Sequence, residues 1–160
     1  QRTKALAPRL GVDIVEARQI GTFSAWKRFV ADQQDKADAL LVIVYHTLRD
    51  DGGNHVDENE VLHWTISNSN LPEIGFWAWA IEGGLLCSEA ISGYEQGYHS
   101  ATLASYVLRG QDAGRFKVER PTRGEICINR KRAEMLGIEI PADLRSTATI
   151  YGSIGSEKVQ

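Results

Sequence analysis

The chain lacks the features that mark several classes of protein. It has two cysteines among 160 residues, and their spacing matches no metal-ligand motif. Its net charge is -3, which gives no indication of the basic face typical of nucleic-acid-binding proteins, so we expect no nucleic-acid partner. The longest apolar run, residues 37–45, is interrupted by Asp38 and is much shorter than a membrane span.

The sequence motifs of common enzyme classes are also missing. There is no Gly-x-x-x-x-Gly-Lys loop, Gly83-Gly84 lacks the third glycine of a dinucleotide fingerprint, and no Gly-x-Ser-x-Gly elbow occurs. The four histidines form no pair at metal-ligand spacing. We therefore predict no catalytic residues, no cofactor and no metal. The alternative is an α/β enzyme whose site is assembled in space around His46 and Cys87.

The two cysteines could form a disulfide or remain as separate thiols. Cys87 and Cys127 lie in segments that we interpret as neighbouring strands, so they could pair in an oxidising compartment. We favour two buried, inert thiols, because unpaired cysteine packs well as a small hydrophobic residue.

The ends of the chain suggest part of a longer protein. The first residue is Gln, no secretory signal is visible, and residues 1–7 are typical of the end of a helix already under way. We expect a single α/β domain over residues 1–151, which is long enough for a compact core. Residues 152–160 are polar and contain Gly and Ser, and they are predicted to be a flexible tail.

Strands and helices alternate along the chain. A helix is expected to end at Gly11, and residues 12–18 to follow as a strand. Thr22 begins a helix with an apolar face, and the β-branched run Ala39–Tyr45 is typical of a strand covered on both faces. Further helices are predicted over 58–68, capped by Asp57, over 94–108, preceded by Gly93, and over 130–136, capped by Asn129. Further strands are predicted over 73–77, 85–91, 116–120 and 126–128. This alternation predicts an α/β fold with a mostly parallel sheet flanked by helices.

Two predicted strand ends carry side chains suited to a ligand. In open parallel sheets, ligands bind beyond the carboxyl ends of the strands. One end offers a phenol, an imidazole and a hydroxyl, and the other offers aromatic rings on which a ligand can stack. These candidate residues are Tyr45, His46 and Thr47 at the first end, and Phe76, Trp77 and Trp79 at the second. The alternatives are a tyrosine that closes the core, a solvated histidine, and aromatic side chains that pack beneath helices.

A third candidate lies at the start of a predicted helix. Ser92 and Tyr94 precede or open the helix over 94–108, where exposed backbone N–H groups favour an anion such as a carboxylate. Tyr94 could equally pack on its own helix.

Three segments in a fixed order resemble the second half of the ABC-type periplasmic substrate-binding proteins, which include binders of aromatic amino acids such as tryptophan. They are the Gly-Phe-Trp stretch of Gly75–Leu86, the tyrosine turn Gly93–Gly97, and the Ile-Asn-x-x-x-Ala-x-x-Leu-Gly-x-x-Ile-Pro motif of Ile128–Pro141. The resemblance extends from about Leu71 to Leu144.

The resemblance implies the type I periplasmic-binding fold, in which two α/β lobes joined by three crossing segments close on a ligand. Segments around 85–92 and 126–129 would be crossings, and the helix over 94–108 would pack on the other lobe. Most of that lobe would precede Gln1, so the isolated chain would expose an apolar helix face and form a homodimer or a swapped dimer.

The resemblance also implies a function. The protein would bind a small molecule outside the cytoplasm, either free in the periplasm or anchored to the membrane. It would serve an ABC transporter permease or act as the sensor domain of a membrane kinase, and it would catalyse nothing. Ser92-Gly93 stands where relatives often carry an acidic residue or tyrosine, and the loop over 49–54 is longer than usual. Tryptophan is therefore not carried over as the ligand.

Overall fold

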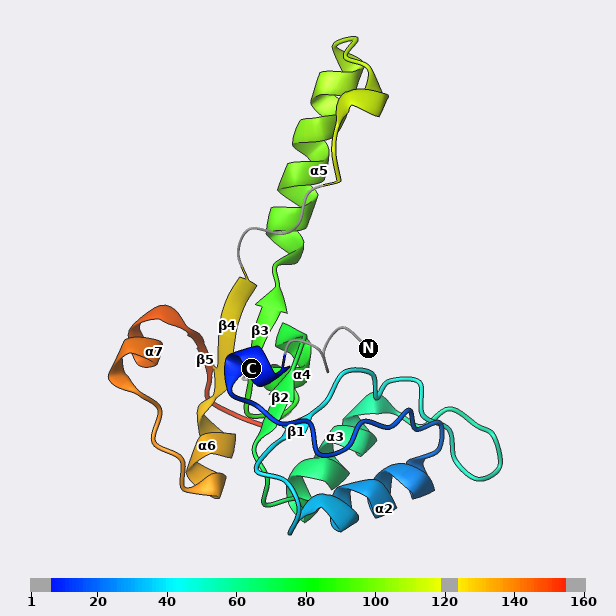
Figure 1. The fold of residues 1–160 in the computed structure, drawn as a ribbon, viewed down its shortest axis with the longest axis vertical. Helices are drawn as coiled ribbons and strands as arrows, with labels where there is room; N and C mark the ends of the chain where they lie inside the picture. Colours follow the sequence, from blue (N-terminus) through cyan, green and yellow to red (C-terminus); the bar gives the residue numbers. More distant parts are fainter. Residues whose placement is uncertain (1–6, 119–123, 155–160) are drawn as a thin grey trace, which may run out of the picture. The chain divides into compact units, whose positions relative to one another are not determined.

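The structure is a computed structural model that describes residues 7–118 and 124–154 (Figure 1). The chain divides into two compact units, Gln1–Glu73 and Ile74–Gln160. The single domain expected over residues 1–151 stays a prediction. The expected helical character of residues 1–6 and the end of the expected tail, 155–160, lie outside the described residues.

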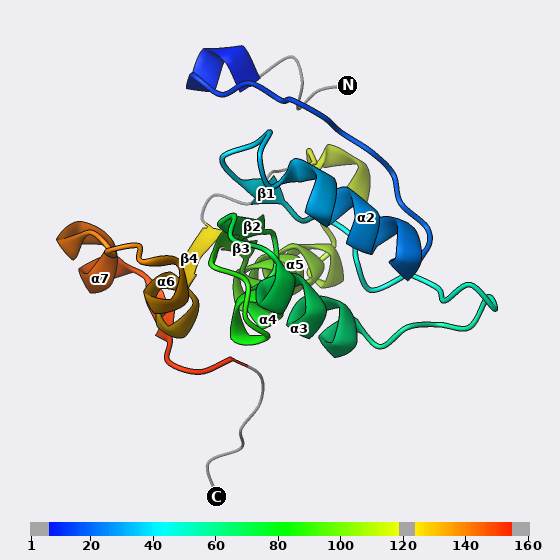
Figure 2. The ribbon, with the colours of Figure 1, turned by 90° about the horizontal axis from the view of Figure 1, so that it is seen from below.

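The first unit is built on two helices that pack together. Thr22 caps α2 (Phe23–Gln33) by accepting a hydrogen bond from the Ala25 N–H, and Asp57 caps α3 (Glu58–Asn68). Figure 2 shows the two helices, which contact each other. The indole N–H of Trp26 donates to Thr65 Oγ1 at 2.9 Å and joins them. A 3-10 helix, η1 (Ala7–Leu10), ends at Gly11, whose φ of 69° confirms the predicted helix stop.

Two strand predictions in the first unit are wrong. Only Leu40–Leu41 forms a strand, β1, in the run predicted as a strand over 39–45, and residues 12–18 form none. Ile43 and Val44 are half-exposed, whereas Val42 is buried. The run is therefore not covered on both faces. A run of β-branched residues favours an extended backbone, but a strand also needs a neighbouring strand to pair with, and the run itself does not specify that neighbour.

Short strands and helices make up the second unit. In chain order they are β2 (Glu73–Gly75), α4 (Ala78–Glu82), β3 (Cys87–Ile91), α5 (Gly93–Leu108), η2 (Ala113–Arg115), β4 (Gly124–Asn129), α6 (Arg130–Leu136), α7 (Ala142–Thr147) and β5 (Thr149–Tyr151). Helix α4 contacts β3 and β4, and α6 contacts β5. The predicted strand over 116–120 does not form at 116–118, and 119–120 lie outside the described residues.

The sheet of the second unit mixes two strand directions. β2 and β3 are parallel, with Ile74 opposite Cys87, and β4 and β5 are parallel, with Ile128 opposite Ile150. Between them β3 and β4 are antiparallel. Two of these three pairings are parallel and helices flank the strands, so the predicted α/β fold with a mostly parallel sheet is confirmed.

Asn129 joins three parts of the second unit. Its side-chain oxygen accepts from the Arg132 N–H at 2.9 Å and caps α6, which ends at Gly137 with a φ of 67°. Its amide nitrogen donates to the carbonyls of Ile81 and Ser153, each at 2.8 Å. The predicted strand, cap and helix are therefore confirmed, and one buried side chain ties them to α4 and to the segment after β5.

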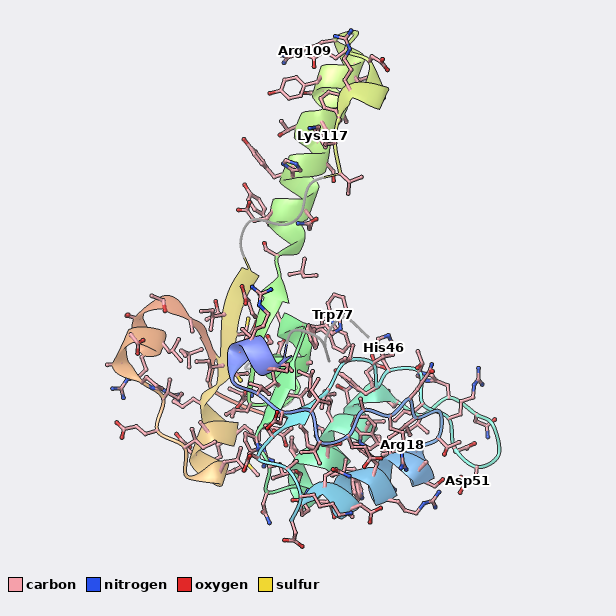
Figure 3. The ribbon with its side chains drawn as sticks, viewed as in Figure 1. Arg18, His46, Asp51, Trp77, Arg109 and Lys117 are labelled. Carbon is pink, nitrogen blue, oxygen red and sulfur yellow. The ribbon has the colours of Figure 1, made fainter. Side chains whose placement is uncertain are left out.

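Helix α5 is the longest helix in the part of the chain that the structure describes. It continues beyond β3, away from the sheet of its unit (Figure 1), and none of its residues is buried. The chain turns at Gly110, where φ is 90°, and returns along the helix, so that the Phe116 ring stacks on Tyr106 at 6.2 Å. Arg109 lies at the end of α5 farthest from β3, and Lys117 lies back along the helix (Figure 3).

Candidate functional site

The first predicted cluster follows β1 in the first unit. Tyr45 is fully buried, and burial, assisted by the charge of Glu58, raises the pKa of its phenol well above the ordinary value. His46 and Thr47 form a turn, and the His46 ring stands nearly perpendicular to Tyr45 at 6.0 Å. Thr47 is exposed and the His46 ring is partly exposed, although its Nδ1 is buried, while Tyr45 lies in the core.

The loop after this turn is tightly hydrogen-bonded. The Val56 N–H donates to Leu48 O at 2.9 Å, and the Asp50 N–H donates to Asn54 O at 2.8 Å. The side chain and backbone N–H of Asn54 also donate to the Asp50 carboxylate and hold its pKa below the ordinary value. The predicted loop over 49–54 is therefore confirmed, and it has a defined shape. Asp51 lies far along it from His46 (Figure 3).

The second predicted cluster follows β2 in the second unit. The strand ends at Gly75, two residues earlier than predicted, and Trp77 is the N-cap residue of α4. The rings of Trp77 and Trp79 stack at 6.4 Å with an angle of 17° between their planes. They are 37% and 43% exposed, so a ligand can reach them. The start of a helix brings the two rings together, where we had expected a continuing strand to do so.

Ser92 and Tyr94 lie where β3 passes into α5. The Ser92 hydroxyl accepts from the Glu95 N–H at 3.3 Å and so caps the helix. Tyr94 is 78% exposed and stacks on Tyr98 of its own helix at 6.3 Å. The i, i+4 spacing of the two tyrosines could have predicted this stacking from the sequence.

An open hollow of about 370 Å³ adjoins Ser92 in the second unit. It is lined by Ser92, Glu95, Gly124, Glu125, Ile126 and Thr147. Its two carboxylates disfavour an anion there by charge repulsion, against the expectation from the helix start alone. Glu95 and Glu125 come from distant segments, and no sequence spacing signals that they meet.

Cys87 and Cys127 do not form a disulfide. They lie on adjacent strands as predicted, but Cys87 is opposite Ile128, and Cys127 is opposite Ser88. Residues one register position apart point to opposite faces of a sheet, so the two thiols do not face each other. Cys127 is buried, which raises its pKa, with a further contribution from the charge of Glu125. Cys87 is only partly buried.

Within residues 7–118 and 124–154, no group of three or more His, Cys, Asp or Glu side chains is placed to hold a metal ion. In the same ranges, no helix has both the length and the apolar character needed to cross a membrane.

The α/β fold of the chain, with a mostly parallel sheet flanked by helices, places it in the class of periplasmic-binding-protein-like folds. The chain belongs to the family of ABC transporter substrate-binding proteins, whose pattern matches residues 2–151. Among the curated proteins, none matches the chain.

Solved structures share this fold. A substrate-binding protein with adhesive properties from Clostridium difficile, in its ligand-free open form, has a TM-score of 0.68 and 21% identity over 92% of this chain and 47% of its own. An ABC domain in complex with L-Trp from Streptococcus pneumonia has a TM-score of 0.67 and 23% identity over 93% and 48% of the two chains. A conserved domain protein from Vibrio cholerae has a TM-score of 0.63 and 21% identity over 92% and 47%. The chain thus spans about half the length of the structures it matches.

Proposed function

We propose that the chain is the C-terminal lobe, with its crossing strands, of an extracytoplasmic receptor that binds a small molecule. The observation that carries this proposal is the family match over residues 2–151. The coverage of about half of each similar structure supports a second lobe elsewhere in the full-length protein. Closure of the two lobes on the ligand would then be the signal that a membrane partner reads. This mechanism needs no covalent step and no cofactor, and the protein is not an enzyme.

The ligand in this proposal has a flat or apolar part. The Trp77–Trp79 pair is half-exposed and stacked, and it forms an aromatic wall in the second unit. Phe76, which directly precedes Trp77 and is 39% exposed, is also part of the proposed set. In the first unit His46 and Thr47 supply polar groups with Tyr45 beneath them. Ser92 and Tyr94 complete the proposed set. The L-Trp bound to the Streptococcus pneumonia domain makes aromatic amino acids the first compounds to test.

The partner in this proposal is an ABC transporter permease. The family name supports this choice over the sensor domain of a membrane kinase, which would bind its ligand in the same way. In either case the protein works outside the cytoplasm, free or anchored to the membrane.

The proposal extends to the state of the isolated chain. In helix α5, Tyr94 is 78% exposed and Leu108 is 87% exposed, and no residue of the helix is buried. Exposed apolar surface of this kind favours association. The isolated chain is therefore expected to form a homodimer or a swapped dimer, and a single monomeric species in light scattering at high concentration would contradict this.

Binding is tested on the full-length protein by tryptophan fluorescence. The panel contains L-tryptophan, L-phenylalanine, benzoate and small aliphatic amino acids, and the variants are Trp77→Ala and His46→Ala. Trp26→Phe serves as a matched control, because Trp26 joins α2 to α3 and is not part of the proposed site. The proposal expects saturable binding of a panel compound that both site variants weaken about tenfold or more and the control leaves unchanged. Turnover of a compound, or binding that neither site variant affects, would contradict it.

A further inference from the structure

The side chain of His55, in the loop of the first unit, forms a hydrogen bond with the turn formed by His46 and Thr47. Its Nε2 lies 2.9 Å from the backbone carbonyl oxygen of His46. A carbonyl oxygen only accepts hydrogen bonds, so Nε2 must carry the proton and donate. Both the neutral Nε2–H tautomer and the imidazolium satisfy this requirement.

The rest of the loop does not depend on this bond. The Val56 N–H bonds Leu48 O, and the Asp50 N–H bonds Asn54 O, both through the backbone. The Arg49 guanidinium donates to Gly53 O at 2.7 Å. These bonds hold residues 48–56 in shape without the imidazole of His55. The bond from His55 instead reaches past the loop to the turn that carries His46 and Thr47.

We propose that His55 is a positioning residue that fixes the His46–Thr47 turn in the orientation from which these two side chains meet the ligand. This role rests on the proposed function. The carbonyl of His46 belongs to the peptide plane that joins His46 to Thr47, so a bond that holds this carbonyl restricts rotation of that plane and pre-organises both side chains before the ligand arrives. Pre-organisation of this kind improves affinity by lowering the ordering cost on binding.

The side chain of residue 55 offers a clean set of variants. His55→Ala removes the donor. His55→Gln keeps an N–H donor at a similar reach from the backbone, because the glutamine amide nitrogen and histidine Nε2 are both separated from Cα by several bonds. His63→Ala is the matched control, since His63 is an exposed histidine on α3.

The experiment titrates the full-length protein and these variants with L-tryptophan, L-phenylalanine and benzoate. A lost hydrogen bond of ordinary strength predicts a Kd raised by about threefold to tenfold in His55→Ala. His55→Gln should recover most of the affinity, and His63→Ala should match the wild type. In the ligand-free protein, hydrogen exchange at the amide of Thr47 should be faster in His55→Ala and normal in His55→Gln.

The outcomes separate the two proposals. Wild-type binding that His46→Ala weakens and His55→Ala leaves unchanged would overturn the role of His55 and leave the proposed function intact. A weakened His55→Ala that His55→Gln does not rescue, with a matching fall in thermal stability, would show a structural role only and would also overturn it. If the wild-type protein binds none of the probes, the proposed aromatic ligand class fails, and the role of His55 fails with it.

Discussion

Helices α3 and α5 have the same kind of beginning and opposite surroundings. Each starts with a side-chain cap, Asp57 for α3 and Ser92 for α5. Yet α3 buries Val61, Leu62, Thr65 and Ile66, whereas α5, which is longer, buries nothing. Local sequence is therefore enough to specify a helix, while burial depends on a partner elsewhere in the protein.

This difference has a physical consequence. A helix that buries an apolar face is stabilised by tertiary packing, whereas an uncovered helix depends on caps and intrinsic propensity. Substitutions in α3 should therefore cost much more free energy than similar ones in α5. In an assembly that covers α5, the difference in free-energy cost between substitutions in α3 and in α5 should be smaller.

The largest expected effect is in the core of α3. Leu62 is 2% exposed, so Leu62→Ala removes buried methyl groups and leaves a cavity. We expect the free energy of unfolding to fall by about 2–5 kcal/mol in urea titrations. A loss below about 1 kcal/mol would mean that α3 is not packed as the structure shows.

The next effect tests polar packing in the second unit. Asn129→Ala removes the cap of α6 and the two donors to Ile81 O and Ser153 O. The lost cap and the two lost hydrogen bonds, one of them to the buried Ile81, together predict a loss of about 2 kcal/mol. Asn129→Asp keeps the cap but loses the donors, and it should remain destabilised in the same urea titration. Equal stability of Asn129→Asp and the wild type would show that the two donated bonds contribute nothing.

The pH dependence of stability tests the burial of the Tyr45 phenol in the first unit. Its pKa is raised in the folded state, and an unfolded tyrosine ionises near pH 10, so the unfolded state loses its proton first. Stability is therefore fully present below about pH 10 and is lost as the pH rises above it. Between about pH 9 and 11 this single group should cost about 1 kcal/mol. Tyr45→Phe should show a correspondingly shallower fall in chemical denaturation, and an unchanged slope would contradict the burial of the phenol.

The Ser92 cap of α5 should have a smaller effect. Ser92→Ala removes the acceptor of the Glu95 N–H at an exposed helix start. The helix content seen by circular dichroism should fall slightly, and stability should decrease by about 0.5–1 kcal/mol. Ser92→Asp keeps a capping oxygen and should behave like the wild type, so a loss in both variants would argue against capping as the cause.

The smallest effect is expected at the uncovered face of α5. Leu108 is 87% exposed, so Leu108→Ala should change the stability of the isolated chain by less than about 0.5 kcal/mol when the chain is diluted until it is monomeric. The full-length protein provides the sharper comparison. A loss above about 1 kcal/mol there would show that a partner covers the leucine, and the same small effect in both proteins would mean that α5 stays uncovered.

The sequence was most predictive where the chemistry is local. The caps at Thr22, Asp57 and Asn129 and the glycines at 110 and 137 mark helix ends through their own side chains or through positive φ, and the structure places the ends there.

Strand predictions succeeded only where a partner exists. The run over 39–45 and residues 12–18 have extended-backbone composition but little or no pairing, whereas the strand predicted over 85–91 forms as β3, which pairs with β2 and β4. Pairing is a non-local property, and a single strand pattern does not contain it.

The candidate site was predictable in its residue types and not in its geometry. Trp77 and Trp79 are stacked as an accessible pair, but the start of α4 brings them together. The proposed positioning role of His55 rests on its bond to the backbone carbonyl of His46, nine positions earlier in the chain. Every residue has a backbone carbonyl, so the sequence does not indicate which one His55 contacts.

The most direct test of the central claim is a thermal-shift measurement of the full-length protein with the panel of aromatic and aliphatic amino acids and benzoate. A ligand that binds the folded state raises the melting temperature by an amount that grows with the ratio of the ligand concentration to its Kd. The proposal predicts that at least one compound raises it in a dose-dependent way, and that Trp77→Ala abolishes the shift. A panel with no shift, or a shift that Trp77→Ala leaves intact, would contradict a solute receptor with its site at these residues.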